Sequence, residues 1–311
     1  MESVALILFL AVFILILFGY PVALTLGGVS IIAGLIFFDI DFFYLVSLRI
    51  FGIMNNFVLL AVPLFIFMGL TLEKSGIAER LLETMAILFG KIRGGLAYSV
   101  IVVGGMLAAS TGIVGATVVT MGLISLPTML KRGYDPKLAT GVIASSGTLG
   151  QIIPPSVVLV LLGSVLNISV GNLFTSALLP GITLVFLYIT YVAFISFLYP
   201  ENVPAMPKKI VDNFRKNTKT IDIINAFLLP FLLIFAVLGS IFMGIASPTE
   251  AAGIGALGAL FLSYAQGSIN YNKLNLISSE TMKLTSIVFM ILLGATSFSL
   301  VFRGLEGDKV L

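Results

Sequence analysis

The chain has no cysteine, no histidine and no tryptophan among its 311 residues. Without cysteine it can form neither disulfides nor reactive thiols. Without histidine it lacks the commonest general base and the commonest transition-metal ligand. No pair of aspartates and no Asp-rich metal motif lies inside an apolar run to replace them. We therefore expect no enzymatic activity and no bound cofactor.

Charge is also scarce. Only 10% of the residues are charged, against roughly 25% in soluble domains, while 59% are hydrophobic and the mean hydropathy is +1.16. The composition predicts an all-α integral membrane protein. The net charge of +3 requires no nucleic-acid partner, because basic loops facing the cytoplasm account for it. With tryptophan absent, tyrosine and phenylalanine must supply any interfacial aromatic belt.

Several apolar runs approach the roughly 20 residues that a membrane helix needs. They lie at 4–18, 22–38, 55–73, 173–199, 223–247, 251–266 and 284–302. Two further segments, at 42–54 and 76–90, are amphipathic and are expected to belong to a scaffold or arm.

Two uncharged stretches do not look like simple membrane helices. Residues 95–130 have a centre of small residues at 108–117, and residues 138–167 are interrupted by glycines, hydroxyls and a Pro-Pro pair. Breaking a helix at membrane depth frees polar backbone groups, which is tolerated only against protein or a hydrated cavity. We predict a re-entrant hairpin at about 95–130 and a discontinuous helix at about 138–167.

The distribution of lysine and arginine supports the hairpin. If 95–130 enters and leaves on one side, all 17 basic residues except Arg49, Arg303 and Lys309 fall on a single side, as expected for the cytoplasmic face. A single crossing at 95–130 would destroy this asymmetry. The basic segment 200–222 is then a cytoplasmic linker.

A weak internal repeat relates the two ends of the chain. The Pro21 region and a later glycine, Gly69, have counterparts in Pro248 and Gly294 at similar spacing. The charge scheme gives the two copies opposite topology, which is typical of secondary transporters. We predict three parts: residues 1–199 form the first repeat and a following span, 200–222 the linker and 223–311 an incomplete second repeat. An equal second copy would extend past residue 311, so we expect the chain to be C-terminally truncated.

The polar interruptions are the candidate sites. At 109–117, hydroxyls and free carbonyls can coordinate a hard cation such as Na⁺; ordinary small-residue helix packing is the alternative. At 145–156, Gly150 permits unwinding and the prolines remove backbone donors. A second half-helix starting near Pro154 and Pro155 would present free amides to an anion. A proline kink without a ligand is the alternative.

Glu250 is a separate candidate, since it is the only charged residue between Ile223 and Asn272. An ionisable residue near the membrane suggests a functional role. The order Ser247-Pro-Thr-Glu250 fits equally a helix start, with Ser247 or Thr249 as cap and Glu250 in the first turn.

Several motifs in order along the chain resemble one known family. They are Phe67-Met-Gly69, Glu73-Lys-Ser-Gly-Ile-Ala78, Lys91-Ile-Arg-Gly-Gly-Leu-Ala97, the small residues at 108–117, Gly133-Tyr-Asp-Pro136, Gly147-Thr-Leu-Gly150, Ile153-Pro-Pro-Ser156 and Ser247-Pro-Thr-Glu-Ala-Ala252. Together they resemble the large permease subunit of TRAP (tripartite ATP-independent periplasmic) transporters, over essentially the whole chain.

The resemblance implies an inverted-repeat, elevator-type transporter in the bacterial inner membrane that imports organic acid anions together with Na⁺. Its implied partners are a small four-helix membrane subunit, a periplasmic substrate-binding protein and the lipid bilayer. Alternatives are an ion-coupled anion transporter of similar fold that needs no binding protein, and a non-transporting membrane scaffold.

The resemblance also implies the site residues. The substrate and ion set is Ser110, Thr111, Gly112, Ser145, Ser146, Gly147, Thr148, Gly150, Pro154 and Pro155, with Na⁺ at Ser110, Thr111, Ser146 and Thr148. The hairpin commonly reads Ser-Gly-Ser-Ser in the family, whereas here it reads Ser-Thr-Gly-Ile from Ser110. The individual Na⁺ ligands therefore differ from the family pattern.

Overall fold

The computed structural model describes residues 2–111, 114–207 and 220–309. Every regular element within these ranges is a helix, which confirms the predicted all-α fold. Contacts divide the chain into two compact units, one of residues 1–57 with 282–311 and one of residues 58–281. The division reflects packing and does not test the predicted repeat boundaries. Each unit is described by itself.

The first unit contains the N-terminal helices and the C-terminal part of α14. Its elements are α1 (Glu2–Leu17), α2 (Val22–Phe37), α3 (Phe42–Met54), the end of α14 (Tyr271–Gly304) and η4 (Gly307–Lys309). Gly294 of α14 lies so close to α2 that an added Cβ would be 2.6 Å from the carbonyl oxygen of Ala23. Only glycine permits this crossing.

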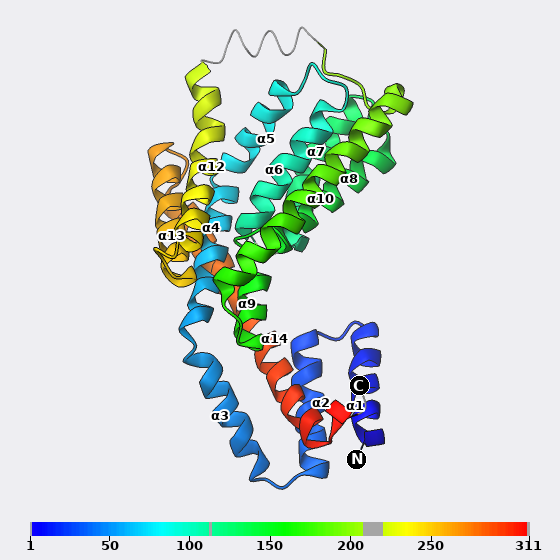
Figure 1. Ribbon diagram of the computed structural model, residues 1–311, viewed down its shortest axis with the longest axis vertical. Coiled ribbons are helices and arrows are strands. Elements are labelled where there is room, and N and C mark those ends of the chain that lie inside the picture. Colours follow the sequence, from blue (N-terminus) through cyan, green and yellow to red (C-terminus); the bar gives the residue numbers. More distant parts are fainter. Residues whose placement is uncertain (1, 112–113, 208–219, 310–311) are drawn as a thin grey trace. The chain divides into compact units, whose positions relative to one another are not determined.

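The second unit contains the two stretches that the sequence singled out. Its elements are α4 (Ala61–Lys74), α5 (Ile77–Leu88), α6 (Gly95–Thr111), α7 (Val114–Lys131), α8 (Pro136–Thr148), η2 (Leu149–Gln151), α9 (Val157–Leu166), α10 (Val170–Leu198), η3 (Pro200–Asn202), α12 (Thr220–Phe242), α13 (Pro248–Ala265) and the start of α14. Helices α5, α6, α7, α8 and α10 run side by side (Figure 1). They enclose the main core, whose centre includes the buried Val100, Met129 and Ala139.

Three of the described helices are long and apolar enough to cross a membrane, namely Phe57–Lys74, Val170–Leu198 and Tyr271–Gly304. The described ranges also contain shorter apolar helical stretches of 10–17 residues. In α10, only 11% of the most apolar 18-residue window is buried within the protein. Most of the side chains of α10 therefore face outward, as expected of a helix that contacts lipid.

Helix starts follow local sequence signals. Before α8, the Asp135 carboxylate accepts hydrogen bonds from the amides of Lys137 and Leu138 at 2.7 and 3.2 Å, and Pro136 occupies the first helical position. Before α13, Ser247 Oγ accepts from the Glu250 amide at 3.3 Å while Glu250 Oε2 accepts from the Ser247 amide at 2.7 Å. The reciprocal pair is a capping box, with Ser247 as the cap.

Two helices begin at other residues than the sequence predicted. Helix α14 begins at Tyr271, well before the predicted span of 284–302, because Asn270 caps it by accepting from the Lys273 amide at 2.8 Å. Helix α9 begins at Val157, just after the predicted start at Pro154 and Pro155, because Ser156 is the cap. Hydropathy locates apolar segments, whereas capping groups set where the helices begin.

Candidate functional site

The segment predicted to be a re-entrant hairpin contains α6 and α7, which pack against each other and are called the hairpin below. Its re-entrant path stays a prediction. Ser110 and Thr111 are the last two residues of α6, and Gly112 lies outside the described residues.

At the other end of the hairpin, the buried Tyr134 hydroxyl accepts a hydrogen bond from the Leu96 amide at 3.3 Å. Burial raises the Tyr134 pKa to about 12. The hydroxyl therefore stays neutral at physiological pH and ties the start of α6 to the α7–α8 turn.

The hairpin packs against α8 at two glycines. A Cβ added to Gly104 of α6 would lie 2.7 Å from Cβ of Ser146, and one added to Gly147 of α8 would lie 2.3 Å from Cγ2 of Val118 on α7. Side chains at either glycine would push the helices apart. Gly104 lies in the second half of α6 and Val118 in the first half of α7, so the structure brings these parts of the hairpin close to the end of α8.

The polypeptide beyond α8 leaves the helical path, as predicted. Helix α8 ends at Thr148, a short 3₁₀ turn follows, and α9 begins at Val157. The amides of Ile152 and Ile153 both donate to the Leu149 carbonyl, at 3.0 and 2.8 Å. Ser156 Oγ donates to the Gln151 carbonyl at 2.8 Å and accepts from the Leu159 amide at 3.4 Å. The buried Ser156 hydroxyl thus pairs with one backbone group on each side of the interruption.

Other backbone groups at the interruption have no hydrogen-bond partner within the described residues. These are the carbonyls of residues 152–155 and the amides of Val157 and Val158. Unpaired backbone groups in a partly buried segment normally bind water or a ligand. The interruption therefore offers hard oxygen ligands beside free amide donors.

The predicted side chains of α8 face different directions. Ser146 is fully buried and its hydroxyl donates to the carbonyls of Val142 and Ile143. Thr148 is exposed and donates to the Ser145 carbonyl at 2.7 Å. Residues two apart on a helix do not face each other, so Na⁺ ligation by Ser146 and Thr148 stays a prediction.

The remaining predicted residues lie at the interruption itself. Gly150 is buried within η2, while Pro154 and Pro155 are buried between η2 and α9. No cluster of three or more acidic residues suited to a metal ion occurs in the described part of the chain. A cation held here would therefore be bound by hydroxyls and carbonyls.

A carboxylate that sequence reasoning did not assign joins α4 to α7. Glu73 Oε1 accepts a hydrogen bond from the Thr120 hydroxyl at 2.8 Å and lies 3.9 Å from the Lys74 ammonium. Lys74 lies 3.3 Å from Glu280 Oε2, which extends the network to the start of α14. The second Glu73 oxygen is buried without a hydrogen bond to described atoms. An isolated Glu at the end of an apolar run was the available signal.

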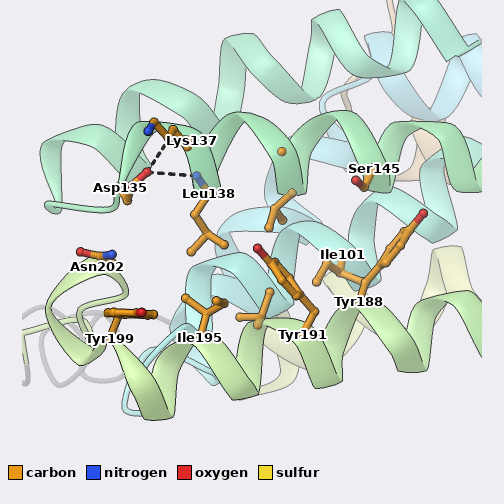
Figure 2. A pocket seen from close by; sticks show the side chains of 13 residues that line it. Ile101, Asp135, Lys137, Leu138, Ser145, Tyr188, Tyr191, Ile195, Tyr199 and Asn202 are labelled. Atoms are coloured by element: carbon orange, nitrogen blue, oxygen red, sulfur yellow. Dashed lines mark hydrogen bonds between the residues drawn. The ribbon is translucent and has the colours of Figure 1, made fainter.

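A groove of about 450 Å³ separates α8 from α10. It is lined by Ile101, Asp135, Lys137, Leu138, Gly141, Val142, Ser145, Tyr188, Tyr191, Val192, Ile195, Tyr199 and Asn202. The rings of Tyr188 and Tyr191 rise from α10 toward α8 (Figure 2). Of the predicted site residues, only Ser145 lines this groove. The tyrosines at one face of α10 were a sequence signal that went unused.

The apolar helices and the interrupted helix packed against a hairpin define a multi-pass helical membrane protein of the transporter class. A family model described as tripartite ATP-independent periplasmic transporter, DctM component, matches residues 9–308. The chain belongs to this family of transporter permeases. This confirms the predicted family and the multi-pass location in the inner membrane.

Characterised relatives match most of the chain. The C4-dicarboxylate TRAP transporter large permease protein DctM of Vibrio cholerae is 32% identical over 257 residues, covering 83% of this chain and 55% of the relative. The sialic acid TRAP transporter large permease protein SiaM of Vibrio cholerae is 32% identical, covering 90% and 64%. The ectoine protein TeaC of Halomonas elongata is 28% identical, covering 92% and 65%. The chain thus spans somewhat over half the length of these relatives.

Proposed function

We propose that the chain belongs to the large membrane subunit of a Na⁺-coupled secondary transporter that imports organic acid anions. In this proposal a periplasmic binding protein delivers the substrate and a small four-helix membrane subunit braces the permease. Two relatives support a carboxylate substrate, since they are C4-dicarboxylate and sialic acid permeases. No enzymatic step and no resident cofactor are required.

The observation that carries the proposal is the interruption between α8 and α9. Its carbonyls at 152–155 have no hydrogen-bond donor among the described residues, and they lie where the hairpin packs against α8. Na⁺ is a hard cation, and carbonyl and hydroxyl oxygens are the neutral ligands available. Discontinuous helices of secondary transporters bind coupling ions with unwound carbonyls and anionic substrates with half-helix N-termini.

In the mechanism that we propose, Na⁺ binds first at the interruption and the hairpin end. The positive charge, together with the free amides of Val157 and Val158 at the start of α9, then favours an organic carboxylate nearby. Charge compensation lowers the cost of moving the anion through a low-dielectric region. The ion and the anion cross together, which makes uptake depend on the Na⁺ gradient.

Transport is tested in proteoliposomes that contain the permease and its small subunit, with the binding protein added outside. We expect uptake of a radiolabelled organic acid to require both an inward Na⁺ gradient and the binding protein, and to need no ATP. Uptake with Na⁺ but without the binding protein would favour the simpler ion-coupled transporter. No uptake with any gradient would favour a membrane scaffold.

Na⁺ binding is tested on the chain itself, because it has no native cysteine. We expect maleimide labelling of Gln151→Cys, at an exposed residue of the interruption outside the predicted ligand set, to slow when Na⁺ replaces choline, since the ion orders the interruption. The matched control is Thr140→Cys, at an exposed residue of α8 away from the interruption. Equal labelling rates at position 151 in Na⁺ and choline would contradict ion binding there.

A further inference from the structure

The groove between α8 and α10 is polar at one end and apolar along its wall. Asp135, Lys137, Tyr199 and Asn202 lie at the polar end. The wall is formed mainly by the aliphatic side chains of Ile101, Leu138, Val142, Val192 and Ile195. Its volume of about 450 Å³ falls within the range of small-molecule sites, about 300–1,000 Å³. This division suits an amphipathic ligand.

Backbone hydrogen bonds fix the polar end before any ligand binds. The Asp135 amide donates to the Asn202 carbonyl at 3.1 Å, which joins the start of α8 to η3. The following residue, Val203, accepts from the Gly94 amide at 3.2 Å. Because the start of α8 is joined to the turn that follows α10, the opening does not have to form when a ligand arrives.

Lys137 supplies the cation at this end, beside the Asp135 carboxylate. The Asp135 carboxylate already accepts from the amides of Lys137 and Leu138, and the Asp135 carbonyl accepts from the Ala139 amide. The first-turn amides of α8 are therefore occupied. The Lys137 ammonium forms no ion pair within the described parts of the chain. It is exposed and free to bind an anionic group.

Three tyrosines complete the amphipathic lining. The hydroxyls of Tyr188, Tyr191 and Tyr199 form no hydrogen bond with other described side chains or backbone, and their rings line the groove beside aliphatic residues (Figure 2). Tyrosine is favoured at membrane interfaces because its ring is apolar and its hydroxyl is polar. The lining thus matches the boundary between an acyl chain and a headgroup.

We propose that the groove binds one anionic phospholipid, with an acyl chain along the aliphatic wall and the phosphate at Lys137. Lipid surrounds a membrane helix such as α10, and basic pockets between membrane helices on the cytoplasmic side favour anionic headgroups. A small dicarboxylate fits less well, because it would place charged groups against an aliphatic wall with a single cation nearby. The lipid site is separate from the proposed transport site.

Binding of the acyl chain along the aliphatic wall is tested by filling the groove with a larger side chain. Gly141 lines the groove, and a Cβ added there meets no atom within 4 Å. We expect Gly141→Phe to reduce, about tenfold, the phosphatidylglycerol retained by the purified chain in native mass spectrometry. Gly122→Phe is the matched control, since Gly122 is also a helical glycine with open space but lies on α7 outside the groove. Equal retention by the two variants would overturn the proposal.

The headgroup contact is tested by charge removal, which also serves if Gly141→Phe does not fold. We expect Lys137→Gln to lower the preference for phosphatidylglycerol over phosphatidylcholine about fivefold, the factor implied by about 1 kcal/mol per basic residue. Lys131→Gln, at the exposed end of α7, should keep the preference. An unchanged preference in Lys137→Gln overturns the proposal, and so does displacement of the retained lipid by succinate at a molar ratio of one.

Discussion

Helix α10 and the α8–α9 segment both contain proline, yet only α8–α9 is interrupted. Pro180 lies inside α10, which continues from Val170 to Leu198. A single proline removes one backbone hydrogen bond, and membrane helices tolerate that loss. Pro154 and Pro155 follow a 3₁₀ turn and precede a new helix start. The presence of proline alone therefore does not decide where the chain unwinds.

The two segments also contact each other. A Cβ added to Gly181 of α10 would lie 2.8 Å from Cγ1 of Ile153 in the interruption. The interruption thus rests on the part of α10 next to Pro180, where the absence of a side chain makes room for it. We infer that the interruption is stabilised by close packing against glycines and by the Ser156 cap.

The largest effect is expected at the contact between α8 and the hairpin. An alanine at Gly147 would place its Cβ 2.3 Å from Cγ2 and 3.1 Å from Cα of Val118, so backbone must move. Gly147→Ala should lower the free energy of unfolding in mixed micelles by about 2–3 kcal/mol. Gly141→Ala, on the open side of α8, should instead raise it by up to about 1 kcal/mol. A neutral Gly147→Ala would show that close packing does not hold this region.

A smaller effect is expected where the interruption meets α10. Gly181→Ala crowds the Ile153 side chain rather than its backbone, so the cost should be about 1–2 kcal/mol. Ile153→Ala removes the atom that clashes. In a double-mutant cycle, the two changes should show a coupling free energy of at least about 0.5 kcal/mol. Additive costs would mean that the two segments do not support each other.

The starts of α9 and α10 differ in how deeply their capping serines are buried. Ser156 caps α9 and is fully buried, whereas Ser169 caps α10 by accepting from the Asn172 amide at 3.4 Å and is exposed. Ser156→Ala should cost about 1–2 kcal/mol, because it removes a buried hydroxyl and leaves the Leu159 amide and the Gln151 carbonyl without their partner in a part-buried segment. Ser169→Ala should cost less, because water can replace the exposed cap. Thermal unfolding in detergent compares the two; equal losses would contradict the role of burial.

These contrasts show what the sequence could predict. Composition and apolar runs were sufficient for an all-helical membrane protein, and the glycines and prolines at 147–155 were sufficient for an interruption. The exact start of α9 at Val157 was not predicted, because Pro154 and Pro155 suggested an earlier start and the Ser156 cap was not recognised. Close contacts such as Gly181 with Ile153 depend on how distant segments pack and have no local pattern.

The same reasoning explains the features that were missed. The groove between α8 and α10 requires two helices to be placed side by side, so the tyrosines on one face of α10 do not by themselves indicate a groove. The bond between Glu73 and Thr120 likewise joins residues on different helices. By contrast, the cap at Ser247 was one of two readings open in the sequence, because a capping box depends on residues three positions apart.

The smallest effect is expected at α13, whose capped start is exposed. Hydrogen bonds from the Ser247 backbone and side chain lower the Glu250 pKa below its ordinary value of 4.5. The stabilisation from ionised Glu250 is therefore complete at neutral pH, and it is lost as the pH falls through the lowered pKa of the folded state. The difference in melting temperature between the native chain and Glu250→Ala should shrink as the pH is lowered from 7 to 3.

Glu250→Gln separates hydrogen bonding from charge at this helix start. A glutamine can still accept from the Ser247 amide, so this variant should keep part of the cap while losing the pH dependence that Glu250 contributes. If Glu250→Gln and the native chain had the same melting temperature at pH 7, the carboxylate charge would add nothing beyond the hydrogen bond. The exposed start of α13 would then differ from the buried start of α9 in burial alone, because both would depend on neutral hydrogen bonds.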